Sequence, residues 1–91
     1  MRTIFKQKLD ICDFQTIELP QDFNILHIAK QNGVPCIWYE CESDMPTVHL
    51  DIYCFGTGYR MDGLPPSVYI GTVVGQDGFV WHYYRSQSLR R

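Results

Sequence analysis

The dipeptide Asn32-Gly33 stands between two strand-like stretches, and it constrains the fold of this chain more than any other feature. Asn-Gly readily adopts the positive φ angles that both central residues of a type I′ turn require. Before the turn, residues 23–31 place Ile25 and His27 on one strand face and Leu26 and Ile28 on the other. After the turn, residues 34–42 are apolar on both faces. The pattern predicts a tight antiparallel hairpin whose second strand lies centrally in a β structure or against another subunit. Pro35 suggests that this strand begins at an edge or a bulge.

Five further segments have strand patterns, and no window of ten or more residues has a helical period. They are residues 3–9, 14–19, 47–55, 68–74 and 79–84. In residues 47–55, alternation places Val48, Leu50, Ile52 and Cys54 on one inward face. We therefore predict an all-β fold of about seven short antiparallel strands, in a sandwich or a small barrel, with no substantial helix.

The length of 91 residues predicts one domain. We assign residues 1–84 to a single β domain and residues 85–91 to an Arg-rich C-terminal tail, which we expect to be solvated. Aromatic residues make up 14% of the chain. A small β domain so rich in rings often buries some of them between subunits, so we expect a homo-oligomer. The interface residues we expect are Trp38, Tyr53, Trp81 and Tyr83.

The four cysteines do not have the spacing of a metal site. No Cys-x-x-Cys pair occurs, and no histidine stands at ligand spacing from a cysteine pair. We therefore predict no metal and no cofactor, and we expect Cys36 and Cys54 to be small core residues. The N-terminus lacks the apolar region of an export signal, and no run is long enough to cross a membrane, so we expect reduced thiols in a cytoplasm.

Ten acidic and eight basic residues give the chain a net charge of −2. Proteins that bind nucleic acid by releasing counterions need a basic surface instead. We therefore expect that the chain does not bind nucleic acid.

The segment Gly56-Thr57-Gly58-Tyr59-Arg60 is the best candidate for a ligand site. Closely spaced glycines allow backbone N–H groups to converge on an anion, and Arg60 could pair with phosphate or carboxylate. Tyr59 could stack on a flat ligand. The alternative is a tight turn that needs the positive φ of glycine. Dinucleotide-binding and P-loop motifs are excluded, because no helix follows.

Histidine is the other source of possible chemistry. His49 and Asp51 share a strand face at a spacing that could orient the imidazole, and His82 could join them in only one strand order. No serine has the context of a nucleophile elbow. We therefore expect that the protein is not an enzyme.

Several segments resemble a family of small bacteriophage and prophage proteins that is known only as a domain of unknown function. These segments are Thr3 to Lys6, Gln15 to Pro20, Gln31 to Trp38, Phe55 to Gly58, Tyr69 to Thr72 and Phe79 to His82. The resemblance covers Met1 to Tyr84 and leaves out the Arg-rich tail. Members of that family typically have His where this chain has Tyr59. The resemblance implies a phage origin and expression in the host cytoplasm, and it supplies no catalytic residues.

These observations together predict a non-enzymatic phage accessory protein that counters host defence. Its expected partner is a host defence protein or a small-molecule signal such as a nucleotide, bound at the Gly56 to Arg60 loop. The alternative is a structural or interaction protein of the virion or its assembly, which acts through its aromatic strands.

Overall fold

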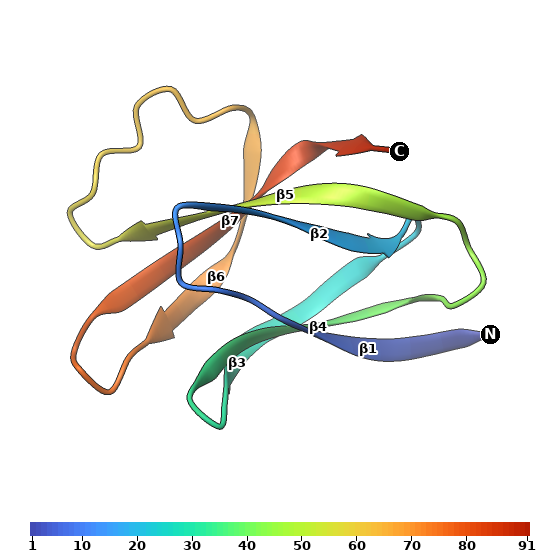
Figure 1. The fold of residues 1–91 in the computed structure, drawn as a ribbon, viewed down its shortest axis with the longest axis horizontal. Helices are drawn as coiled ribbons and strands as arrows, with labels where there is room; N and C mark the ends of the chain where they lie inside the picture. Colours follow the sequence, from blue (N-terminus) through green and yellow to red (C-terminus); the bar gives the residue numbers. More distant parts are fainter.

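The computed structural model describes all of residues 1–91 and contains seven β-strands and no helix (Figure 1). The strands are β1 (Arg2–Lys8), β2 (Phe14–Pro20), β3 (Asn24–Gln31), β4 (Val34–Glu42), β5 (Thr47–Gly56), β6 (Ser67–Val74) and β7 (Val80–Arg90). The predicted all-β fold is therefore confirmed. The chain has no helix of the length and apolarity needed to span a membrane.

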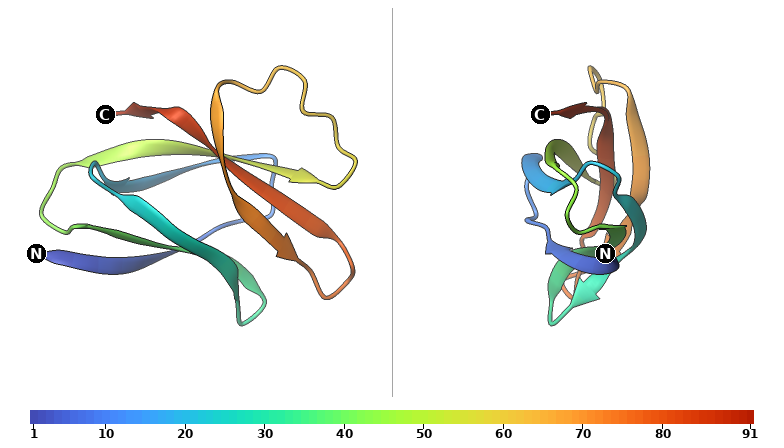
Figure 2. Two further views of the ribbon diagram at one scale, coloured as in Figure 1. Left: turned by 180° about the vertical axis from the view of Figure 1, so that it is seen from behind. Right: turned by 90° about the vertical axis from the view of Figure 1, so that its right-hand side faces the viewer.

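The strands form two antiparallel sheets that pack face to face as a sandwich (Figure 2). One sheet has the order β1-β4-β3, and the other has the order β2-β5-β7-β6. The long strand β4 is central in its sheet, as the apolar residues on both of its faces predict. The edge strands β3 and β6 of the two sheets lie against each other, which closes one side of the sandwich.

The core lies between the sheets and is built by the alternation of β5 and β4. Leu50 and Ile52 on β5 are fully buried, and they meet Ile37 and Cys41 from β4 in one apolar cluster. The inward face predicted for β5 is confirmed, and so is the burial of Cys36 and Cys54.

The hairpin between β3 and β4 has the predicted geometry. Asn32 has a φ of 52° and Gly33 has a φ of 79°, so both central residues are in the left-handed region. Pro35 follows the turn in a central strand, where it is buried and faces Lys30 of β3. Its carbonyl accepts a hydrogen bond from the amide of Leu9, just beyond the end of β1. Pro35 therefore lies where the pairing of β4 with β1 ends, so its missing N–H interrupts no hydrogen bond within that pairing. A central strand can accept proline at this position, and the strand does not have to lie at an edge.

Each of the strands β3 and β6 carries one β-bulge, at Leu26 and at Ile70. The extra residue reverses the side-chain alternation of β3. Ile25 and Ile28 consequently both pack toward the core, and His27 lies exposed on the outer face beside Trp38.

The last strand does not stop at Tyr84. β7 continues to Arg90, and its end pairs with β5 through Leu89 opposite Leu50 and Arg90 opposite His49. Ser86 is buried, and Arg90 forms an ion pair with Asp51. The β domain therefore does not end at residue 84, as predicted, but includes residues 85–90 as strand, while residues 87–91 are exposed to solvent as expected. A bulge between Leu50 and Ile52 shifts the register here, so the residues beyond Tyr84 lose the alternation that marks a strand in the sequence.

Candidate functional site

Trp81 occupies the open end of the sandwich. It lies near the start of β7, two residues before the buried Tyr83 and on the same inner face, and it pairs with Gly56 of β5 and Val73 of β6. Its side chain is half-buried. Three adjoining hollows with volumes of about 330, 360 and 90 Å³ all include Trp81 in their walls. Trp81 is therefore the wall that the three hollows share.

Gly56 makes room for an aromatic contact to Trp81. The turn from Gly56 to Tyr59 is closed by a 3.0 Å hydrogen bond from the Tyr59 amide to the Gly56 carbonyl, with Gly58 at a φ of 89°. The Tyr59 ring folds back over Gly56, where an added Cβ would lie only 2.8 Å from its Cε1 atom. The ring then meets Trp81 edge to face at 6.1 Å. A side chain at position 56 would displace the Tyr59 ring from this contact.

The loop does not form the anion-binding nest predicted for Gly56 to Arg60. The Thr57 amide donates to the carbonyl of Val80 and the Tyr59 amide is used in the turn, so neither is free for an anion. Arg60 is exposed and pairs with Asp62, with 2.8 Å between Nε and Oδ2. The tight turn, which the sequence left as the alternative, is the geometry present. Gly56, Thr57 and Tyr59 nevertheless line the 360 Å³ hollow beside Trp81 and Phe79.

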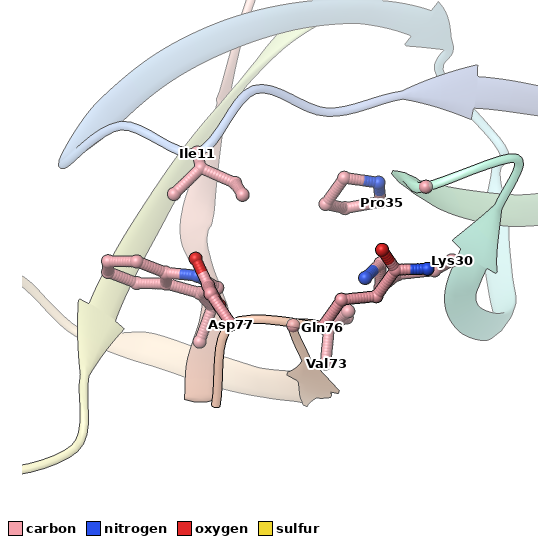
Figure 3. A pocket seen from close by; sticks show the side chains of 9 residues that line it. Ile11, Lys30, Pro35, Val73, Gln76 and Asp77 are labelled. Carbon is pink, nitrogen blue, oxygen red and sulfur yellow. The ribbon is translucent and has the colours of Figure 1, made fainter. Parts of the chain in front are cut away.

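The 330 Å³ hollow lies between the tips of the β3–β4 and β6–β7 hairpins (Figure 3). Ile11 and Pro35 lie on one side of it, and Gln76 and Asp77 come from the β6–β7 turn. Lys30 also lines it, and no carboxylate lies within ion-pair distance of its ammonium group. The Asp77 carboxylate already accepts a 3.1 Å hydrogen bond from the Phe79 amide. The hollow therefore offers an aromatic wall, an unpaired cation and a side-chain amide.

This combination suits a flat ligand that carries negative charge. Trp81 provides a large aromatic surface whose far side is supported by Phe79, stacked at 6.0 Å. Lys30 provides a charged donor within the same hollow. Concave sites with mainly apolar walls and a few placed polar groups are the usual form of small-molecule sites.

Cys54 and the buried Tyr83 near the site are chemically quiet. Cys54 and Cys12 line the smallest hollow. Burial raises the pKa of the Cys54 thiol, which keeps it protonated and a poor nucleophile. Burial also raises the pKa of Tyr83 well above its ordinary value. Its hydroxyl donates a 3.0 Å hydrogen bond to the carbonyl of Asp10.

The residues considered for catalysis do not converge. His49 lies 3.7 Å from a Glu18 oxygen, and Asp51 instead accepts a hydrogen bond from Thr16 and pairs with Arg90. His82 stands opposite Phe55, six residues along β5 from His49, and its ring bridges the hydroxyls of Thr57 and Thr72 at 2.8 and 2.9 Å. No three His, Cys, Asp or Glu side chains gather in a cluster that could hold a metal ion.

The four residues predicted for a subunit interface do not share a surface. Tyr83 is fully buried in the core, so it has no exposed surface to present to a second subunit, and its assignment was wrong. Trp38 lies on the outer face of the three-stranded sheet, and Tyr53 lies on the outer face of the other sheet. Trp81 faces inward at the open end.

Tyr53 instead belongs to an aromatic row that crosses all four strands of the larger sheet. The row runs from Phe14 to Tyr53, Tyr84 and Tyr69, each opposite the next in the strand register. Successive ring contacts include Phe14 with Tyr53 at 5.7 Å and Tyr84 with Tyr69 at 5.3 Å. Sequence reasoning missed this row because it depends on strand order.

The fold and these sites define a small all-β domain with a hollow, aromatic-walled end and an aromatic outer face. The chain belongs to the family described as Domain of unknown function (DUF7352), whose model matches residues 1–90. The match includes residues 85–90, which the sequence resemblance had left out. No curated protein and no solved structure matches the chain.

Proposed function

We propose that this protein works by binding rather than by catalysis, and that it captures a small, flat, anionic ligand against Trp81. One observation carries the proposal: the half-buried indole of Trp81 lines the same hollow as Lys30, a cation without a carboxylate partner. A cation without a carboxylate partner, beside a half-buried aromatic ring, leaves both groups available to a ligand. An anion that carries an aromatic group can use both at once.

A nucleotide has the required chemistry, since its base stacks on aromatic rings and its phosphate pairs with lysine. The hollow of about 330 Å³ is suited to a ligand of this size. The resemblance to phage proteins supports a setting in the host cytoplasm, where the captured nucleotide is a defence signal and its removal protects the phage. In this proposal Trp81 and Lys30 take the roles that the sequence suggested for Tyr59 and Arg60.

Isothermal calorimetry tests the proposal with mononucleotides, cyclic nucleotides and ADP-ribose-type compounds. At least one compound is expected to bind, and Lys30→Ala is expected to weaken it by about 1.5–3 kcal/mol, the size of a lost charge-assisted hydrogen bond. Arg60→Ala is the matched control, because Arg60 is exposed and paired with Asp62. Absence of binding across the panel, or an equal loss with Arg60→Ala, would contradict the assignment.

The aromatic row supports a second candidate, an interaction or assembly role in the virion. Phe14 and Tyr69 are each 53% exposed at its two ends, an unusual exposure for rings on a sheet face. In this alternative the row is buried against a second copy or another virion protein.

Sedimentation at increasing protein concentration, with Tyr69→Ser as the variant, tests self-association. Mass spectrometry of purified particles tests incorporation, and a monomeric protein absent from particles would remove this candidate.

A further inference from the structure

A fourth hollow, which does not include Trp81, lies between the beginnings of β3 and β6. It has a volume of about 220 Å³, and its lining residues are Phe23, Asn24, Ile25, Val68, Tyr69, Ile70 and Arg85. Five of these seven residues are hydrophobic, and none is acidic. Arg85 is therefore the only charged side chain among the residues that line this hollow.

Arg85 differs from Arg2, Arg60 and Arg90 in its burial and in its lack of an ion-pair partner. Arg2, Arg60 and Arg90 are exposed, and each pairs with a carboxylate. Arg85 is more buried than these three and has no acidic partner. Its guanidinium carbon lies 5.3 Å from the centre of the Phe23 ring, and Nη1 donates a 2.9 Å hydrogen bond to the Ser86 carbonyl. Most of its five N–H donors consequently have no protein acceptor.

The carboxylate that contacts the rim residue Asn24 is already engaged by other groups. The Asn24 amide donates to Glu40 at 2.9 Å, and Glu40 also lies 3.7 Å from Arg2. The cation–π contact with Phe23 orients the guanidinium without neutralising its charge. A partly buried guanidinium in this state is a receptor for an anion.

We propose that Arg85 binds a carboxylate whose apolar substituent fills the hollow among Ile25, Val68 and Ile70. The planar fork of arginine matches the two oxygens of a carboxylate. The hydrophobic side chains among the lining residues favour one negative charge on an apolar body over a highly hydrated phosphate. Both a free carboxylic acid and the C-terminal residue of a peptide carry this chemistry.

The test uses hexanoate as the probe and hexanamide as its neutral match, with the Arg85 Nε–H signal followed by NMR. Hexanoate is expected to shift this signal and the Ile70 amide in a saturable manner, and hexanamide is expected to bind at least about tenfold more weakly. Equal binding of the two probes, or no shift at about 10 mM hexanoate, would overturn the proposal. The second arm compares a short peptide ending in leucine with its C-terminal amide. Tighter binding of the free-acid peptide than of hexanoate identifies a chain terminus as the source.

Variants locate the site. Arg85→Met retains the apolar stem and removes the charge, so hexanoate affinity is expected to fall at least about tenfold. Arg60→Met is the same change at an exposed arginine and is expected to leave affinity unchanged. Lys30→Met probes the Trp81 hollow and is also expected to have no effect. A loss with either control that equals the loss with Arg85→Met would refute the site. Should Arg85→Met fail to fold, Arg85→Lys, which retains the charge without the fork, is expected to lose affinity severalfold.

Discussion

Gly71 of β6 packs directly on Ile28 of β3, so closely that a Cβ atom added to Gly71 would lie 2.2 Å from Ile28 Cγ2. This contact joins the edges of the two sheets. Along both strands it separates the hollow at Trp81, which includes Lys30 and Val73, from the hollow at Arg85, which includes Ile25 and Ile70. One glycine therefore determines how closely the sheets approach between the two candidate sites.

Gly71→Ala is expected to lower the free energy of unfolding by about 1–3 kcal/mol, the usual cost of overpacking a core. Ile28 is β-branched, so its Cγ2 methyl can move away only if the side chain leaves its preferred χ1 rotamer or the strand shifts. Urea denaturation measures the change. Combining Gly71→Ala with Ile28→Ala removes the clashing methyl, so the double variant is expected to be less destabilised than the sum of the single variants. Strict additivity would show that the two residues are not in contact.

Gly33→Ala tests the hairpin through the backbone alone. Nothing lies within 4 Å of the position that an added Cβ would take, so there is no steric clash with other residues. The φ of 79° is unfavourable for alanine, and the expected loss of stability is about 1–2 kcal/mol. The thermal midpoint measures the loss. An unchanged midpoint would mean that the turn does not require the left-handed conformation.

Tyr83 is expected to make stability fall in alkaline solution. Burial raises its pKa in the folded state above the ordinary value of about 10, so the unfolded chain releases this proton at a lower pH than the folded chain. The contribution of Tyr83 to stability is thus complete below about pH 10 and is lost as pH rises toward the folded pKa. The measurement compares the urea midpoints of wild type and Tyr83→Phe from pH 7 to above about pH 10.

At neutral pH, Tyr83→Phe is expected to be less stable by about 1 kcal/mol, because the hydrogen bond to the Asp10 carbonyl is lost. Above about pH 10 the gap between wild type and variant should narrow, since the variant lacks the titrating group. Parallel pH profiles for the two proteins would contradict the buried position of this hydroxyl.

Cys12 is expected to react first with a thiol reagent. Cys36, Cys41 and Cys54 are buried, and burial raises the pKa of the Cys41 and Cys54 thiols, whereas Cys12 is only half-buried. Mass spectrometry after brief labelling should find one modification, which Cys12→Ser abolishes, and four in denaturant. Rapid labelling of two or more cysteines in the native protein would contradict the packing of the core.

The sequence was sufficient to predict the elements whose signals are local. Asn32-Gly33 predicted its hairpin, and the alternation in residues 47–55 predicted the inward face of β5. The bulge at Leu26 and the extension of β7 beyond Tyr84 could not be found in this way, because each one interrupts the alternation on which strand prediction depends.

The candidate sites were harder to predict, because they depend on which strands become neighbours. Trp81, Lys30 and Gln76 meet only once the two hairpin tips lie at the same end of the sandwich. The glycines of the 56–60 loop signalled a turn correctly, but composition could not show that its amides are used internally. The positions of Gly56 and Trp81 opposite each other on β5 and β7 also required the strand order.

The most direct test of the proposed function follows the fluorescence of Trp81. The chain has two tryptophans, so Trp38→Phe leaves Trp81 as the only one. Titration of this variant with the nucleotide panel is expected to give saturable quenching with at least one compound. Trp81→Leu should lose that binding by calorimetry, whereas Trp38→Leu, the matched change on the outer face of the other sheet, should retain it. Unchanged Trp81 fluorescence with every nucleotide, or equal affinity in the two leucine variants, would contradict a binding site at Trp81.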